Sequence, residues 1–200
     1  MRPTFLLALI AAILLLPGCS DERIFDPDRQ QSEDPEEIET RKEVAALASG
    51  AKTDDPEHSA AYDKAINSLI LRGSKVETRL IDTLRSSPDA ATRIGCVEVL
   101  TAIATKASIE HLVAVLDDEA PLVAQRSDIA LRTLTGQRMI PEAGQPAKEG
   151  LPPVPVRPAS DLAMDAEERA WAAWHAQHKA ELKAAWERWW VANKAGFTLK

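Results

Sequence analysis

The sequence predicts an all-α protein, a short α-solenoid of about two and a half helical pairs followed by a tryptophan-rich helix. Leu69, Leu100 and Leu131 stand 31 residues apart. The motif Leu80-Ile81-x-x-Leu84 recurs 32 residues later as Leu112-Val113-x-x-Leu116, and all five tryptophans follow residue 170. A period of this size is typical of solenoids, because each helical pair buries its apolar face only against its neighbour.

Composition narrows the class of protein. A chain of 200 residues accommodates one domain with appendages. Only 4% of the residues are aromatic, so we expect a core of Leu, Ile, Val and Ala. The formal net charge of −7 repels phosphate backbones, which argues against nucleic acid as a partner. Cys96 lies among apolar residues of an expected helix, and we interpret it as a small buried hydrophobe rather than a reactive thiol.

Residues 1–18 have the pattern of an export signal. Arg2 precedes an apolar run from Phe5 to Leu16, which is too short to cross a bilayer. The next residues, Leu16-Pro17-Gly18-Cys19, resemble the cleavage box of bacterial lipoproteins. That resemblance implies cleavage before Cys19 and a covalent lipid on its sulfur, which would anchor the chain to a membrane. Apart from this lipid we expect no cofactor. An ordinary secretory signal with a chance cysteine is the alternative.

Residues 19–34 are polar and acidic, and we interpret them as a tether. Such a segment buries too little apolar surface to fold alone. We therefore expect it to hold the domain away from the membrane, with a specific interaction tail as the alternative. Ser20 is not the aspartate that retains lipoproteins in the inner membrane under the best-known sorting rule. The sequence therefore favours the cell envelope, on the periplasmic side of the outer membrane.

Helix starts and stops recur through residues 35–136, the expected repeat domain. Asp34-Pro35 and Asp55-Pro56 each place an N-cap before a proline at the first helical position. We expect the first helix to end at Gly50 and to form an N-terminal lid. The second should end at Gly73, because glycine commonly follows the last turn of a helix.

The later helices follow the same pattern. A helix from Lys75 to Arg85 completes the first pair, and Ser87-Pro88-Asp89 starts the next unit. Thr105-Lys106 makes the turn of that unit. Pro121 begins the last helix, which Gly136 closes. The side chains that we expect to face inward from the last helix are Leu122, Ile129, Ala130, Leu131 and Leu134.

These motifs resemble a known repeat. Pro88-x-x-x-x-Arg93-x-x-Cys96-x-x-x-Leu100, followed by Ile109-x-x-Leu112-x-x-x-Leu116, is similar to a HEAT repeat of the phycobilin-lyase-like type. The segment 130–136, Ala-Leu-Arg-Thr-Leu-Thr-Gly, resembles an ending common in bacterial HEAT-repeat lipoproteins. These often continue to a Trp-x-x-Trp-Trp segment, as here at 186–190. The resemblance implies an α-solenoid scaffold. HEAT-type hydroxylases bind iron through His-Glu dipeptides, and this chain has none, so we expect no enzyme activity, no catalytic residues and no metal.

A proline-rich linker, residues 137–160, separates the repeats from the C-terminal region 161–200. We expect an extended, partly polyproline-like segment there. Asp165 then caps a long helix whose aromatic stripe has three interpretations. In the first the helix caps the solenoid, in the second it docks another protein, and in the third it rests in a membrane interface. The tryptophans that we assign to protein binding are Trp171, Trp174, Trp186, Trp189 and Trp190.

The function that fits best is a non-catalytic, lipid-anchored scaffold that binds an unidentified envelope protein. In a HEAT stack the second helix of each pair lines the concave face, which would expose Arg79, Asp82, His111 and Val115. The alternative is an accessory subunit of a membrane-associated enzyme, or a protein with a weak metal site at His175 and His178. These two histidines are three residues apart on the expected helix, and no third ligand is evident.

Overall fold

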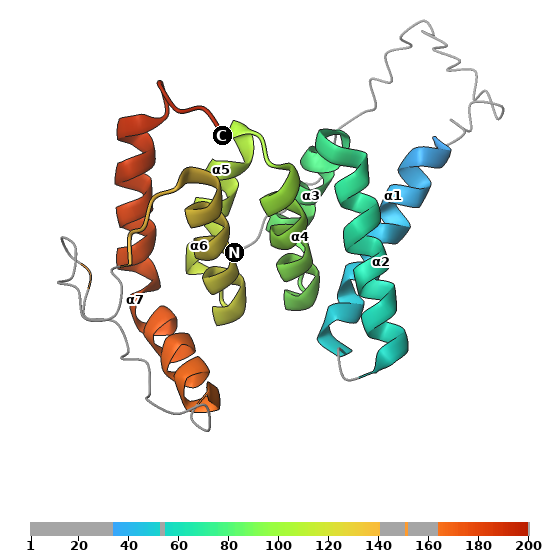
Figure 1. Ribbon diagram of the computed structural model, residues 1–200, viewed down its shortest axis with the longest axis horizontal. Helices are drawn as coiled ribbons and strands as arrows, with labels where there is room; N and C mark the ends of the chain where they lie inside the picture. The colour runs from blue at the N-terminus through green and yellow to red at the C-terminus, as the bar shows by residue number, and fades with distance from the viewer. Residues whose placement is uncertain (1–33, 53–54, 141–150, 152–163, 200) are drawn as a thin grey trace, which may run out of the picture. The chain divides into compact units, whose positions relative to one another are not determined.

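The computed structural model describes residues 34–52, 55–140, 151 and 164–199. Within these ranges the regular structure consists of α-helices and short 3₁₀ helices, with no strand. The prediction of an all-α helical-repeat fold is therefore confirmed (Figure 1). The described helices belong to one unit, Asp34–Lys200. The expected signal peptide, Cys19 and nearly all of the expected tether lie outside the described residues.

The first two helices begin where their caps predict. The Asp34 side chain accepts a 3.0 Å hydrogen bond from the amide of Glu36 at the start of α1 (Pro35–Ala46). Asp55 does the same for Glu57 at the start of α2 (Pro56–Arg72), at 2.9 Å. Between them, the 3₁₀ helix η1 (Leu47–Lys52) continues the first helix beyond its α-helical part. Gly73 has φ 63° and ends α2, a backbone conformation that glycine adopts without strain.

Four further helices follow in sequential order. They are α3 (Glu77–Ser86), α4 (Ala90–Ile103), α5 (Lys106–Ala114) and α6 (Pro121–Thr135). The 3₁₀ helices η2 (Gly73–Val76) and η3 (Val115–Asp117) are the connecting turns. Helix α4 lies in the middle, packed against η1 and α3 and also against α6 (Figure 1). The periodic leucines Leu69, Leu100 and Leu131 are all fully buried, so the 31-residue period is a period of the core.

Two buried charged side chains join successive repeats. Glu77 at the start of α3 accepts hydrogen bonds from the amide and hydroxyl of Thr105, both at 2.9 Å, and from Ser108. The Glu77 carboxylate therefore accepts hydrogen bonds at the N-terminal end of α5. Arg93 of α4 donates to the Ser87 carbonyl and to Asp118 before α6, both at 2.8 Å. These bonds compensate most of the polar groups that the repeat interfaces bury, as burial requires, while Nε of Arg93 has no hydrogen-bond partner among the described residues.

Some inward positions differ from the sequence-based prediction. Leu122 and Ile129 of α6 are 42% and 38% exposed, so the expectation that they face the core is wrong. They lie seven residues apart, on one face of α6. The α6 side chains that are buried instead include the polar pair Ser127 and Asp128. Cys96 is buried as expected, and burial raises the pKa of its thiol to about 12.

The C-terminal helix α7 (Met164–Asn193) packs against α5, α6 and η3 at the end of the stack (Figure 1). The prediction of a long helix after residue 160 is confirmed. Of the expected linker, the structure describes residues 137–140 and 151. Of these, Ile140 and Leu151 are buried in the same hydrophobic core as the repeats.

Candidate functional site

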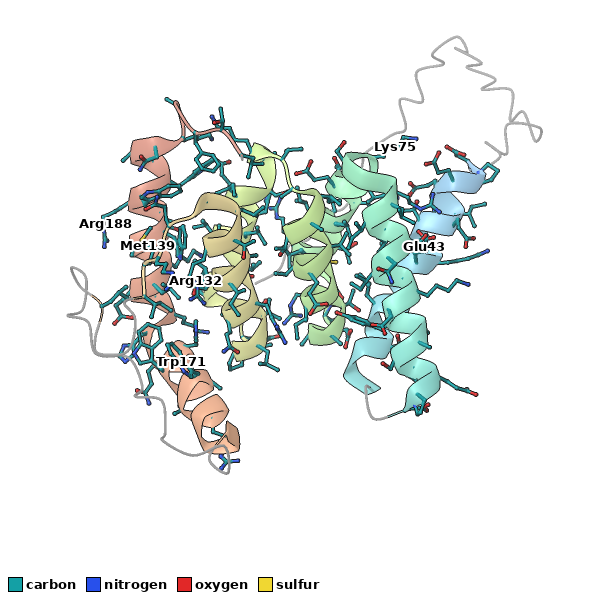
Figure 2. The ribbon with its side chains drawn as sticks, viewed as in Figure 1. Glu43, Lys75, Arg132, Met139, Trp171 and Arg188 are labelled. Atoms are coloured by element: carbon teal, nitrogen blue, oxygen red, sulfur yellow. The ribbon has the colours of Figure 1, made fainter. Side chains whose placement is uncertain are left out.

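A buried polar cluster joins α6 to α7. The indole N–H of Trp186 donates a 2.9 Å hydrogen bond to Oδ1 of Asp128, and both side chains are fully buried. Oδ2 of the same carboxylate lies 3.0 Å from Nε of Arg132, one helical turn further along α6. Burial raises the pKa of Asp128, and the Arg132 charge and the indole hydrogen bond oppose that rise. Arg132 lies on the side of α6 that faces α7 (Figure 2).

His175 is the second titratable group of this junction. Its side chain is only 1% exposed, and Nδ1 has no hydrogen-bond partner among the described residues. Its ring lies 6.2 Å from that of Trp171 and 5.4 Å from that of Trp174, between centroids. Burial, followed by the nearby Arg132 charge, lowers the pKa of His175 to about 4. His178 is half-buried, so the two histidines that the sequence analysis considers together have different environments.

The outer polar contacts between the C-terminal region and the repeats share one direction in the described part of the chain. The donors lie on α7 or, for Lys194, directly after it, and the acceptors lie on α5, η3 or the residue after η3. Lys179 donates to the carbonyls of Asp117 and Asp118 at 3.1 and 3.2 Å. Lys183 Nζ lies 2.7 Å from Asp117 Oδ2. Glu110 accepts from the Trp190 indole at 3.1 Å and from Lys194. The last repeat thus presents carboxylates and carbonyls to a helix that carries indoles and ammonium groups.

The tryptophans divide into two groups. Trp174, Trp186 and Trp190 are buried against the repeats, whereas Trp171 and Trp189 are half-buried. Phe197 packs on Trp189 and Trp190 beyond the end of α7, with centroids 5.8 and 5.5 Å away. This arrangement is the first of the three alternatives, in which the helix caps the solenoid. A role for these five residues in binding a partner stays a prediction.

The four residues expected on the concave face have different environments. Arg79 of α3 pairs with Glu37 of α1. Asp82 is exposed and His111 of α5 is half-buried. Val115 is only 9% exposed, so its expected exposure is wrong. The physical reason is that α5 ends at Ala114 and Val115 begins the 3₁₀ helix η3, where the side-chain direction changes. That Arg79, Asp82 and His111 contact a partner remains a prediction.

An open groove lies at the C-terminal end of α6, and the sequence analysis did not identify it. Its volume is about 430 Å³, and it is lined by Ile129, Arg132, Thr133, Gly136 and Arg138. Gly136 has φ 69° and turns the chain out of the helix, and a Cβ atom at this position would meet nothing within 4 Å. The signal in the sequence is weak: a helix-ending glycine with an arginine on either side.

The described residues contain no group of three or more His, Cys, Asp or Glu side chains placed to hold a metal ion. No helix in the same ranges has the length and apolar character needed to cross a bilayer. Comparison of the chain with protein-family models, with curated proteins and with solved structures finds no match.

Proposed function

We propose that this chain is a non-catalytic protein-binding module of HEAT-repeat type, held at a cell-envelope membrane by lipid on Cys19. The observation that carries the proposal is the outer face of α6. Leu122 and Ile129 are exposed there, beside the groove that Ile129 also lines. Neighbouring exposed apolar side chains with a polar rim mark interaction sites, and arginine, which lines this groove at positions 132 and 138, is enriched in protein interfaces.

The repeat architecture supports a binding role. Stacked helical pairs form an extended surface on a rigid core, and such stacks serve chiefly as scaffolds for partners. Helix α7 covers the end of the stack, so the next repeat position is occupied within the chain. Among the described residues of this last repeat, Leu122 and Ile129 remain partly exposed on one face of α6. The acidic chain makes a protein partner more suitable than a nucleic acid.

The binding surface is tested by photocrosslinking in membranes. A photoreactive amino acid replaces Ile129 in one protein and Leu122 in another, and crosslinked partners are identified by mass spectrometry. Leu71 of α2 provides the matched control, because it is an aliphatic side chain that is 87% exposed and lies outside α6. We expect a specific adduct from positions 122 and 129 and none from 71. No adduct from α6, or an equal yield from position 71, contradicts the assignment.

The anchor has its own test. Cells are grown with a radioactive fatty acid, and the protein is purified from the membrane fraction. The wild-type chain should carry label, and the Cys19→Ala chain should carry none and should leave the membrane. Label on the Cys19→Ala protein would exclude Cys19 as the attachment site.

A further inference from the structure

We propose that the groove at the end of α6 binds the carboxylates of an acidic peptide segment of a partner protein. This inference rests on the proposed function and adds the chemistry of the ligand. Two of the five lining residues are arginines, Arg132 and Arg138. The guanidinium group is planar and offers paired N–H donors, which match the two oxygens of a carboxylate.

The buried carboxylate of Asp128 positions the Arg132 side chain. Its Nε lies 3.0 Å from the carboxylate of Asp128, which is itself fully buried and hydrogen-bonded to Trp186. About a third of the Arg132 side chain remains exposed, on the groove side. A guanidinium that is already oriented loses less conformational freedom when it binds a ligand. The buried cluster between α6 and α7 therefore supports the groove.

The charge of this region contrasts with that of the whole chain. Residues 121–138 contain three arginines and one acidic residue, Asp128, so their formal charge is 3 − 1 = +2, whereas the chain carries −7. Asp128 is buried and does not face solvent. The negative end of the α6 dipole opposes an anion at this place. Charge-assisted hydrogen bonds from a guanidinium to a carboxylate are stronger than neutral ones and counteract that opposition.

The apolar side of the groove favours a peptide over a small anion. Ile129 lines the groove, and Leu122 is exposed on the same face of α6. A peptide that contains both glutamate and leucine contacts both kinds of wall, whereas a free carboxylate or phosphate contacts only the arginines. The volume of about 430 Å³ is sufficient for a few side chains.

The test uses the full chain in detergent micelles and NMR spectra of its backbone amides. The probe is acetyl-Leu-Glu-Glu-Leu-Glu-Glu-amide, and its matched control has glutamine in place of each glutamate. We expect saturable shifts at Thr133, Gly136 and Arg138 with the acidic peptide alone. Arg138→Gln should weaken binding by up to about fivefold, the size of one exposed ion pair. Arg85→Gln, at an exposed position of α3, should leave the affinity unchanged.

Each other outcome overturns the inference in a defined way. Equal binding of the glutamine peptide makes the site purely apolar. Equal affinity for glutarate or inorganic phosphate makes it a small-anion site. If the amides do not shift with any probe, the arginines only stabilise the end of α6. Arg132→Lys, which keeps a charge beside Asp128, guards against a variant that fails to fold. The crosslinking from positions 122 and 129 reports on the proposed function separately, since it requires no acidic ligand.

Discussion

Helices α4 and α6 occupy equivalent places in the repeat, yet they bury different chemistry. A shift of 31 residues superimposes Leu100 on Leu131, and both are fully buried. The same shift places Cys96 on Ser127 and Val97 on Asp128. All four of these side chains are buried as well, so an apolar pair in the middle of the stack becomes a polar pair at its end.

The difference reflects what each helix meets. Helix α4 has repeat elements on both sides, η1 and α6, whereas α6 has α4 on one side and α7 on the other. A buried carboxylate is costly unless it is paired and hydrogen-bonded. Asp128 is paired with Arg132, which lies 3.0 Å from Oδ2 without a hydrogen bond to it, and Oδ1 accepts a hydrogen bond from the Trp186 indole. An apolar repeat helix would leave Asp128 without that donor, so α6 favours a helix with a correctly placed indole and disfavours further stacking.

The largest effect should come from removing that indole. Trp186→Ala deletes a fully buried side chain and leaves Oδ1 of Asp128 without its donor. We expect a loss of about 3–5 kcal/mol in the free energy of unfolding, the usual cost of removing a large core residue. Urea unfolding followed by circular dichroism at 222 nm measures it. The exposed neighbour Glu187→Ala is the control and should change stability by less than about 0.5 kcal/mol. A loss below about 1 kcal/mol for Trp186→Ala would mean that α7 contributes little to the folded state.

The next effect depends on pH. The folded pKa of His175 is lowered to about 4, and an unfolded histidine titrates near 6.5. Position 175 therefore binds a proton more readily in the unfolded chain than in the folded one. The contribution of the neutral His175 to the free energy of unfolding is complete above pH 6.5 and is lost as pH falls toward 4. The shift corresponds to about 3 kcal/mol at its limit. The raised pKa of Asp128 acts in the opposite direction, since the folded state then takes up that proton more readily.

The variant His175→Phe separates the pH dependence that His175 contributes to stability from that of Asp128. The difference in unfolding free energy between the wild type and His175→Phe should move in favour of the variant as pH falls from 7 to 4, by up to about 3 kcal/mol. Urea unfolding at several pH values measures this difference. His178→Phe changes the half-buried histidine of the same helix and serves as the control. A constant difference between wild type and His175→Phe across this range would show that His175 is not buried in the folded protein.

A smaller effect is expected from substitutions at two equivalent positions of α4 and α6. Gly95 of α4 corresponds to Arg126 of α6, which is exposed. A Cβ atom at Gly95 would lie 3.0 Å from Cβ and Cδ2 of Leu47 in η1. We therefore expect Gly95→Val to lose about 1–3 kcal/mol through overpacking. Arg126→Val should stay within about 0.5 kcal/mol. Thermal unfolding of both variants provides the comparison, and equal losses would contradict tight packing between α4 and η1.

Local signals were sufficient for most of the repeat. The pairs Asp34-Pro35 and Asp55-Pro56 begin their helices as expected because capping and the fixed φ of proline act within a few residues. The leucine period also predicts the core, since a solenoid repeats the same contacts along the chain. Gly73 and Gly136 end helices because each adopts a positive φ there.

The α6–α7 junction was harder to predict, for a physical reason. Hydrophobic periodicity assigns charged residues to the outside and leucines to the inside. It therefore places Asp128 outside and Leu122 inside, the reverse of what is observed. In α7 aromatic side chains occupy a broad arc, and only the position of the repeats decides that His175 and Trp190 are buried while Trp189 is partly exposed. The groove depends on the turn at Gly136, so spacing along one helix cannot reveal it.

The smallest effect concerns the rim of the same junction. Lys183 of α7 lies 2.7 Å from Asp117, whose side chain is 46% exposed. An ion pair in contact with water contributes about 0.2–1 kcal/mol and is screened by salt. We expect Lys183→Ala to lose less than about 1 kcal/mol at low ionic strength, and the loss should largely disappear in 1 M NaCl. Urea unfolding at the two salt concentrations measures this. Trp186→Ala should keep its full loss at high salt, because a buried indole is not screened. If salt reduced both losses equally, charged groups at the rim, rather than the buried Asp128–Trp186 contact, would hold α7 to the repeats.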